Sequence, residues 1–479
     1  MKKEVPAILP LTLRQILTFS TWILLLSGCL LLLISCSNSR PTLVTFASSS
    51  ATDFAVSTPR AKNDSSSFSK NFFSAFPLVR VQIIGSDSDQ AAGGKSGKEA
   101  DGEVLEFLFD TGNAGLSVVD ISVAQRLGLK PTPSGSISFA GVTLPTLRAK
   151  ADRVQLFNHG RAERRLQLRD INFQVVDLTP FAELAGRRVD GILGYDVIRR
   201  FVTTVDYQRQ TVIFGKETVI RPPAATASPS PVAGIATSDK SSTESSSGVS
   251  KQGNRIVMPF ELRNGWIVVK TQINGSLQEE MILDTGASIT TFTQEKARQL
   301  SFDVSSARPT TLMLPIGRLT YLPHRLREIE FGGVKLDNTA SVVVSTRDGL
   351  FTAGTGMSLL GANVLRRFLL TIDYGRRQLT LERYAGFESD PHEYTSIGVL
   401  PMLRDGHFYV SGVVNGSPAD DEGIEIGDEI VQLDGRAMDA YSFSELADAL
   451  RGPDGSHLDI TVRRGLRTIE LRLKRVRLL

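Results

Sequence analysis

Cysteine is almost missing from this sequence: its two cysteines, Cys29 and Cys36, both lie within the first 36 of 479 residues. The rest of the chain therefore has no disulfide, no thiol nucleophile and no thiolate metal ligand. Its five histidines are scattered and form no close pair of the zinc-binding kind. The sequence thus predicts no metal and no cofactor, and the stability of the protein must come from packed cores.

An excess of charge of one sign is also missing. The net charge is only +3, and no long run of a single sign occurs, so nothing in the sequence indicates a nucleic-acid partner. The hydrophobic fraction of 41% and the charged fraction of 22% are ordinary for globular proteins. With 479 residues, the chain is long enough for about three domains.

The longest apolar run lies at the N-terminus. Lys2, Lys3 and Arg14 precede the uncharged segment Ile16–Cys36, and a positive flank before an apolar run is typical of an export signal. The segment is also about long enough to cross a bilayer as a helix. We therefore expect residues 1–36 to be a signal peptide or a membrane anchor.

Both cysteines end a motif that resembles the lipobox of bacterial lipoproteins, at Leu26–Cys29 and at Leu33–Cys36. In such proteins the cysteine is lipidated and becomes the new N-terminus. Cys29 and Cys36 are therefore candidates for lipidation, and two cysteines that merely fall in a membrane segment are the alternative. Under every interpretation the rest of the chain is exported. We expect it in the cell envelope, on the periplasmic side of a bacterial membrane.

Two stretches are poor in periodic apolar residues and rich in small polar ones. Residues 37–70 and 218–253 cannot bury enough apolar surface to order themselves, and we expect both to be disordered linkers. They divide the exported part into three bodies, at residues 71–217, 254–388 and 389–479.

The first two bodies repeat each other. The sequence FLFDTGNAGLSVV (Phe107–Val119) corresponds to MILDTGASITTFT (Met281–Thr293). Further on, DGILGYDVIRRFVTTVDY (Asp190–Tyr207) corresponds to SLLGANVLRRFLLTIDY (Ser358–Tyr374). Two motifs that recur in the same order at similar spacing indicate a duplicated domain. Short alternating runs with Gly and Asn at the turns predict that each copy is mainly β, with one or two short helices.

In both copies an apolar strand leads directly into Asp-Thr-Gly, at Asp110 and at Asp284. A buried carboxyl resists ionisation, because removal from water penalises its charged form. If a pseudo-twofold axis relates the copies, the two carboxyls meet and share one proton. Such a pair can deprotonate a water as it attacks a carbonyl, and can protonate the leaving nitrogen.

At these residues the two copies resemble retropepsin-like aspartic proteases. Each carries two marks of that family, a hydrophobic-hydrophobic-Asp-Thr-Gly motif and a later hydrophobic-hydrophobic-Gly motif that ends at Gly194 or Gly361. The resemblance implies two β-barrel lobes in a pseudo-twofold bilobal unit, with Asp110 and Asp284 as the catalytic dyad. It also implies supporting roles for Thr111, Gly112, Thr285, Gly286 and Ser288.

The first copy departs from the family pattern after its glycine. The second copy has Ser288, whose hydroxyl could bond the outer oxygen of the dyad, whereas the first offers only Asn113 as a substitute. Two hairpins, Ser134–Leu144 and Leu314–Leu322, lie at about the distance expected for flaps over a substrate. Tyr321 in the second hairpin is either a substrate contact or a surface aromatic of a strand.

The last body resembles a bacterial PDZ domain. The resemblance rests on Gly416–Ala419, Gly427–Ile430 and Asp434–Gly435. It implies a small α+β domain in which a loop captures the terminal carboxylate of a peptide, and the peptide then adds as a strand. We expect that loop to contain Gly406, His407 and Phe408, with Ser444–Leu450 on the neighbouring helix.

Together these features predict an exported, membrane-tethered aspartic endopeptidase that acts on polypeptides, with a PDZ domain that binds substrates or protein C-termini. Two alternatives stay open. One is a catalytically weak scaffold that binds peptides through the PDZ domain. The other is a chain in which each lobe pairs with the same lobe of another chain. The distance between Asp110 and Asp284 separates these hypotheses.

Overall fold

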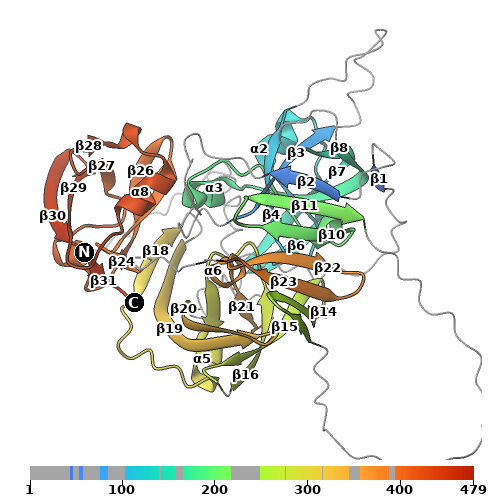
Figure 1. The fold of residues 1–479 in the computed structure, drawn as a ribbon. Helices are drawn as coiled ribbons and strands as arrows, with labels where there is room; N and C mark the ends of the chain where they lie inside the picture. Colours follow the sequence, from blue (N-terminus) through green and yellow to red (C-terminus); the bar gives the residue numbers. More distant parts are fainter. Residues whose placement is uncertain are drawn as a thin grey trace, which may run out of the picture.

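The structure, a computed structural model, describes two β-rich lobes and a C-terminal domain (Figure 1). The mainly β architecture predicted from the sequence is confirmed. None of the helices in the described part is long and apolar enough to cross a membrane, and the apolar segment with Cys29 and Cys36 lies outside it. The described residues are 44–46, 53–57, 76–84, 103–139, 142–157, 165–216, 249–275, 277–314, 317–344, 356–385, 387 and 394–479.

Lobe 1 is built on an eight-stranded sheet in the order β1-β8-β5-β9-β4-β3-β7-β6. Phe107 and Phe109 alternate with Leu108 on β4 and all three are buried, because both faces of this central strand are covered. The elements are β1 (Val44–Phe46), β3 (Leu78–Ile84), β4 (Leu105–Phe109), β5 (Val118–Asp120), α2 (Ile121–Arg126), β6 (Thr132–Phe139), β7 (Val142–Phe157), β8 (Arg165–Val176), α3 (Thr179–Ala185), β9 (Gly191–Leu193) and α4 (Tyr195–Ile198).

Lobe 2 repeats these connections. The parallel pair β16–β21 matches β4–β9, and the parallel pair β17–β20 matches β5–β8. The helices that follow also match, since the side chains of Asp120 and Thr293 cap α2 and α5. The elements are β14 (Glu261–Arg263), β15 (Trp266–Ile273), β16 (Leu277–Leu283), β17 (Thr290–Thr293), α5 (Gln294–Gln299), β18 (Thr310–Leu314), β19 (Gly317–Phe331), β20 (Val334–Val344), β21 (Ser358–Leu360) and α6 (Ala362–Leu365).

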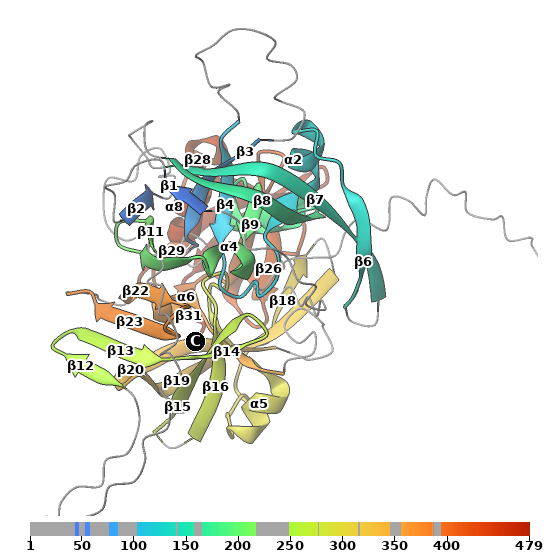
Figure 2. The same cartoon turned by 90° about the vertical axis from the view of Figure 1, so that its right-hand side faces the viewer.

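A seven-stranded sheet in the order β12-β13-β23-β22-β10-β11-β2 joins the lobes (Figures 1 and 2). At its centre β10 and β22, the second repeated motif of each lobe, pair antiparallel with Thr204 opposite Thr371. The hydroxyls of these two threonines lie 2.8 Å apart, so the pseudo-twofold axis passes between them. The strands are β2 (Asp53–Ser57), β10 (Phe201–Asp206), β11 (Thr211–Lys216), β12 (Ser250–Gln252), β13 (Arg255–Pro259), β22 (Phe368–Asp373) and β23 (Gln378–Arg383).

Three short strands of the two sheets fall where the composition predicts linkers. β1 and β2 lie within residues 37–70 and pair with β8 and β11, and β12 lies within residues 218–253 and pairs with β13. The linker prediction is therefore wrong for these positions. A short edge strand is held by backbone hydrogen bonds to its neighbour, so a poor apolar pattern does not exclude it.

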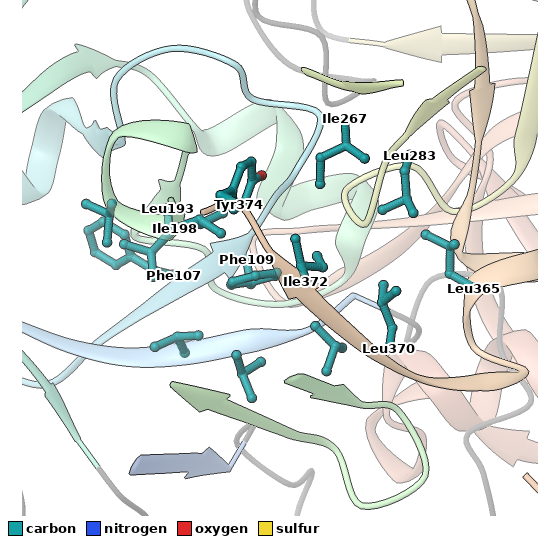
Figure 3. Close-up of a cluster of buried hydrophobic side chains, with 14 of the residues drawn as sticks. Phe107, Phe109, Leu193, Ile198, Ile267, Leu283, Leu365, Leu370, Ile372 and Tyr374 are labelled. Carbon is teal, nitrogen blue, oxygen red and sulfur yellow. The ribbon is translucent and has the colours of Figure 1, made fainter. Parts of the chain in front are cut away.

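One apolar core runs beneath both Asp-Thr-Gly loops. Figure 3 shows Phe107 and Phe109 of lobe 1 in the same cluster as Leu283, Leu370 and Ile372 of lobe 2. All five side chains are fully buried. Because this core crosses the boundary between the lobes, burial of apolar surface fixes their relative position as well as their internal packing.

The C-terminal domain has a core of its own and contacts both lobes. Its strand β26 pairs with β18 of lobe 2, and its strand β25 packs against α3 of lobe 1. The elements are β24 (Thr395–Ser396), β25 (Val399–Arg404), β26 (His407–Val414), α7 (Pro418–Asp421), β27 (Glu429–Leu433), β28 (Arg436–Ala437), η3 (Met438–Ala440), α8 (Phe443–Ala449), β29 (His457–Arg464), β30 (Arg467–Lys474) and β31 (Val476–Arg477).

Candidate active site

Each Asp-Thr-Gly loop begins where a buried strand ends. β4 and β16 end directly before Asp110 and Asp284. The backbone N–H of Asp110 donates to Leu193 O at 3.2 Å, and that of Asp284 donates to Leu360 O at 3.1 Å. The downstream Leu-Gly motif of each lobe therefore holds its acidic loop from the neighbouring strand, which explains why the two motifs recur together.

The two threonines of the motif interlock across the axis. Thr111 Oγ1 donates to Leu283 O at 2.8 Å, and Thr285 Oγ1 donates to Phe109 O at 2.8 Å. Each hydroxyl also accepts a hydrogen bond from the backbone N–H of the other threonine at 3.0 Å. Both side chains are fully buried. Four hydrogen bonds between the lobes thus meet directly below the two aspartates.

Both carboxyl groups are buried, with 2% of Asp110 and none of Asp284 exposed. Gly112 N–H donates to Asp110 Oδ1 at 2.7 Å. Gly286 N–H and Ala287 N–H donate to Asp284 Oδ1 at 2.8 and 3.0 Å. Asp284 Oδ2 is buried, and no N–H or hydroxyl group of the residues that the structure describes donates to it. It is the oxygen that is free to hold a shared proton or a water.

Asp110 lies directly against the acidic loop of lobe 2. A Cβ added to Gly286 would lie 2.5 Å from Cγ of Asp110, which is shorter than any carbon–carbon contact allows. Gly286 is not in the left-handed backbone region, so the close approach of the two loops, and not a turn, requires glycine here. The structure therefore brings the predicted residues Asp110 and Asp284 together within one chain.

The geometry favours one shared proton on the pair. Burial, and after it the negative charge of Asp284, raises the pKa of Asp110 well above its usual value. Burial raises the pKa of Asp284 to about 6, although hydrogen bonds from Gly286 N–H, Asp110 and Ala287 N–H act to lower it. Asp284 therefore ionises first and Asp110 keeps the proton, which gives one base and one acid side by side.

Comparison with known proteins agrees with this geometry. The sequence profile of the aspartyl protease family matches residues 99–197 and 269–364, one stretch in each lobe. Each lobe thus contains a stretch that matches the aspartyl protease family. A second profile, that of the PDZ domain, matches residues 409–464, and the C-terminal domain is a PDZ domain.

Several individual proteins resemble parts of the chain. A retropepsin-like aspartic protease from Rickettsia conorii is 25% identical, with a TM-score of 0.22, and the match covers 27% of this chain and 100% of that one. A probable CtpA-like serine protease of Staphylococcus haemolyticus is 24% identical over 98 residues, which are 20% of each chain. A carboxy-terminal-processing protease of Bartonella bacilliformis is 24% identical over 103 residues, 21% of this chain and 24% of the relative. The chain thus spans about a quarter or less of these curated relatives.

The protease lobes do not support their dyad with the predicted hydroxyl. The described hydrogen bonds of Ser288 use its backbone, whose carbonyl accepts from Asn363 N–H at 3.1 Å, while Asp284 Oδ2 stays without a partner in the described residues. Asn113 does not substitute in lobe 1, because its Oδ1 accepts from Gly115 N–H at 3.1 Å within its own loop. In the part of the chain that the structure describes, neither of these two side chains therefore makes a hydrogen bond to the carboxyls.

Lobe 2 supports the acidic loop of lobe 1 in a way that the sequence did not predict. Trp266 Nε1–H donates to Gly112 O at 2.9 Å, and the Trp266 side chain is buried. Gly265 has a φ of +94°, and a Cβ there would lie 2.4 Å from Ala114 O. The sequence does contain the Asn264-Gly265 turn followed by one of only two tryptophans in the chain. This pattern does not indicate which residue Trp266 contacts.

The two hairpins expected as flaps are present. In lobe 1 the hairpin is β6–β7 (Figure 2), and in lobe 2 it is β18–β19, with Thr310 paired to Tyr321. Tyr321 lines a cavity between lobe 2 and the PDZ domain, and burial raises its pKa to about 12. Its half-buried side chain is thus not the exposed surface aromatic that the sequence allowed, and a contact with substrate stays a prediction.

Behind each acidic loop, a side chain on a short helix caps the following strand. Asp196 Oδ1 accepts from Ser117 N–H and Ser117 Oγ–H at 2.8 Å each. In the other lobe, Asn363 Oδ1 accepts from Thr290 N–H at 2.9 Å and Thr290 Oγ1–H at 3.0 Å. The two roles are equivalent, but only Asp196 can ionise, and burial raises its pKa to about 6.

We expect the substitution Asp196→Asn, which copies the residue of lobe 2, to remove a pH dependence of stability. The folded state binds the proton of Asp196 more tightly than the unfolded state, so this residue destabilises the fold as pH rises from about 4 through 6. The side chain keeps some exposure, so the difference is about 1–2 kcal/mol. Urea unfolding should show a gain for the variant at pH 7.5 that disappears at pH 4. An equal difference at both pH values would contradict this.

The residues expected to form the peptide-binding loop of the PDZ domain lie elsewhere. Asp405 and Gly406, with φ values of 50° and 80°, form the tight turn between β25 and β26. His407 is exposed, with Nδ1 3.0 Å from Glu429 Oε1, and Phe408 is buried in the core of the domain. A two-residue turn between paired strands has no room for a loop that could surround a carboxylate.

A cavity of about 180 Å³ lies at a different part of the PDZ domain. Its walls include Gly398, Val399 and Leu400 at the start of β25, and Ala447 and Leu450 from the α8 region, as expected for Ser444–Leu450. Gly406, His407 and Phe408 do not contribute to these walls. Within the described residues, no group of three or more His, Cys, Asp and Glu side chains could hold a metal ion.

Proposed function

We propose that this protein is an exported aspartic endopeptidase that hydrolyses peptide bonds with a water held by Asp110 and Asp284. The observation that carries this proposal is the meeting of one buried carboxyl from each lobe over the interlocked Thr111 and Thr285. The match of both lobes to the aspartyl protease family supports it. The curated relatives include a serine protease, so the aspartic mechanism rests on the dyad and on its chemistry.

The shared proton defines the order of events. Ionised Asp284 takes a proton from the water as the water oxygen attacks the scissile carbonyl carbon, while Asp110 donates its proton to the carbonyl oxygen. The product is a tetrahedral diol. Asp284 then protonates the leaving nitrogen as the C–N bond breaks, and one diol hydroxyl returns a proton to Asp110. Each cycle consumes one water and leaves the pair with its single proton.

Incubation with a mixed peptide library from acid to neutral pH, followed by mass spectrometry, tests this activity. We expect cleavage that is blocked by a peptide with a hydroxyethylene group in place of the scissile bond, since this group resembles the diol. We expect no effect of a fluorophosphonate, which modifies serine nucleophiles. Inhibition by the fluorophosphonate alone would contradict the aspartic mechanism.

A peptide-binding scaffold with little catalysis is the second candidate. It is favoured by the lack of a supporting hydroxyl, since neither Ser288 nor Asn113 donates a side-chain hydrogen bond to the dyad in the part of the chain that the structure describes. The same library separates the two functions. Peptides that are retained by the protein but not cut at any pH would support the scaffold.

We also propose that residues 1–36 export the chain and tether it on the periplasmic side of a bacterial membrane. The tether is either a lipid on Cys29 or Cys36 or an uncleaved apolar helix, and the apolar run with its positive flank supports both. Labelling of expressing cells with a fatty-acid analogue tests this. Loss of label in only one of Cys29→Ser and Cys36→Ser identifies the lipidated residue, and an unlabelled wild type supports the helix.

A further inference from the structure

Lobe 2 contacts the acidic loop of lobe 1 at one peptide group, the one that joins Gly112 to Asn113. The carbonyl end of this group, Gly112 O, accepts the hydrogen bond from Trp266 Nε1–H at 2.9 Å. The N–H end, that of Asn113, faces Asp110 and lies 3.4 Å from Asp110 O. A single peptide group therefore connects the indole of lobe 2 with the acidic residue of lobe 1.

The indole is held in place by packing from both lobes. Trp266 is buried in a small apolar cluster with Val268 and Ala287 of lobe 2, and Ala114 of lobe 1 packs against the same cluster. The turn before it also fits closely, because a Cβ on Gly265 would lie 2.4 Å from Ala114 O. A buried indole N–H needs a partner within the protein, so the bond to the loop fixes the orientation of the peptide group.

The corresponding position of lobe 1 lacks this donor. The strand pairings place Leu78 of β3 and Val268 of β15 opposite equivalent residues of β4 and β16. The residues two positions earlier, Phe76 and Trp266, are therefore counterparts. The ring of Phe76 has no N–H and packs instead against Phe181 of α3, with ring centroids 5.9 Å apart. The counterpart of Trp266 thus gives no such support to the loop of lobe 2.

The two acidic loops also differ in the N–H groups that follow each aspartate. In lobe 2, two successive N–H groups donate to Asp284 Oδ1, at 2.8 and 3.0 Å. In lobe 1, Gly112 N–H donates to Asp110 Oδ1 at 2.7 Å, and Asn113 N–H makes the long contact with Asp110 O. A carbonyl that accepts a hydrogen bond makes the N–H of its own peptide group a stronger donor. The bond from Trp266 therefore strengthens the weaker of the two N–H contacts with Asp110.

This support acts against the other influences of lobe 2 on Asp110. Burial and the negative charge of Asp284 raise the pKa of Asp110, and two backbone N–H groups of its own loop act to lower it, because they stabilise the ionised form. The phenol of Tyr374 also interacts with Asp110, and it stays neutral because burial raises its pKa. Lobe 2 thus acts on Asp110 in two opposite ways, through the charge of Asp284 and through the N–H of Trp266.

We propose that Trp266 is a positioning residue for Asp110, because its indole N–H fixes the Gly112–Asn113 peptide group from the other lobe and so keeps Asp110 oriented as the acid of the pair. It acts through this peptide group and not on the reacting atoms. Loss of the N–H leaves Asp110 less well oriented and harder to ionise. The effect on peptide cleavage rests on the proposed function, whereas the effect on the ionisation of Asp110 does not.

Two replacements of Trp266 in the full-length protein test this proposal. Trp266→Phe copies the residue of lobe 1, and benzothienylalanine at the same position keeps the shape of tryptophan but has sulfur in place of the N–H. We expect both to lower kcat about tenfold or more, with a change in KM of less than about threefold. The upper limb of the pH profile, where Asp110 loses its proton, should move to higher pH by about half a unit or more, since its ionised form loses the support of an N–H.

Tyr384→Phe is the matched control. Tyr384 of lobe 2 also donates from an aromatic side chain to lobe 1, at 2.8 Å to Asp206 Oδ1, but its partner lies outside both acidic loops. This variant should unfold at lower urea and keep the upper limb of the wild-type pH profile. Trp266 variants that lose stability in the same way but keep the wild-type kcat and pH profile would show a purely structural role and overturn the proposal. Full activity with benzothienylalanine would also overturn it.

The link between Trp266 and Asp110 is also measured without substrate. The chain has only two tryptophans, Trp22 and Trp266, so ¹⁵N-labelled tryptophan gives two indole signals, and Trp266→Phe assigns them. We expect the Trp266 signal to shift with pH as Asp110 ionises, and to lose this shift in Asp110→Asn. A Trp266 signal that ignores the ionisation of Asp110 would contradict the link. If no peptide is ever cut, the proposed function fails, while this titration still decides whether Trp266 and Asp110 are coupled.

Discussion

Replacement of Asp110 by Asn, and separately of Asp284 by Asn, is expected to lower kcat/KM for peptide cleavage by about 10³-fold or more. Asn has nearly the same shape as Asp but can neither donate a carboxyl proton nor accept one from water. The acid and the base act on the same water and scissile bond, so loss of either stops the cycle. The double variant should be hardly worse than either single one, because the two groups act as a unit.

The control for this prediction is stability, which should move in the opposite direction. Burial raises the pKa of Asp284 to about 6, so the folded state binds its proton more tightly than the unfolded state does. Wild type therefore loses stability as pH rises from about 4 through 6. Asp284→Asn should unfold at higher urea than wild type at pH 8, by about 2–3 kcal/mol, and not at pH 4. An inactive variant that is also less stable at pH 8 would point to misfolding.

Replacement of Thr111 or Thr285 by Val is expected to produce the largest loss of stability at the site. Valine keeps the branched shape but removes a hydroxyl that donates to a carbonyl of the other lobe and accepts from the other threonine. One buried carbonyl and one buried N–H would lose their partners, at a cost of about 2–5 kcal/mol in the free energy of unfolding. Because the dyad lies directly above, kcat should also fall at least tenfold.

Serine provides the matched control at both positions. Thr111→Ser keeps the hydroxyl and its hydrogen bonds, so it should lose less than about 1 kcal/mol and most of its activity should remain. Urea unfolding and peptide cleavage measure both effects. The double variant Thr111→Val with Thr285→Val should lose less than the sum of the single losses, because the two hydroxyls serve one network. Equal effects of Val and Ser would show that the interlock contributes little.

The sequence predicts the dyad because every requirement for it is local and occurs twice. An apolar strand, an Asp-Thr-Gly turn and a downstream Leu-Gly motif each leave a mark in the chain, and the repeat places Asp110 and Asp284 in equivalent positions. The tight Asn274-Gly275 turn is equally local, with φ values of 52° and 87°. In both cases a short stretch contains all the residues that the feature needs.

The features that the sequence did not predict are contacts between bodies. Three examples are the hydrogen bond from Trp266 to Gly112, the pairing of β18 with β26, and the ion pair of Glu183 with Arg404. No repeat or periodic pattern in the sequence relates the two residues of any of these contacts. The PDZ loop was misplaced for a related reason. A Gly next to aromatic residues is typical of both a ligand-binding loop and a two-residue turn, and only the pairing of β25 with β26 distinguishes them.

A single-chain active site requires one complete dyad in each chain, and mixing the two inactive variants is the sharpest test of this requirement. Asp110→Asn and Asp284→Asn protein are combined at several ratios, incubated together, and assayed for peptide cleavage. If each chain pairs its own Asp110 with its own Asp284, no mixture can contain an intact pair within one chain, and we predict no activity at any ratio. Recovery of activity in the mixture would show that Asp110 of one chain pairs with Asp284 of another, and activity of either variant alone would show that the same lobes of two chains pair. Either result would contradict the single-chain active site.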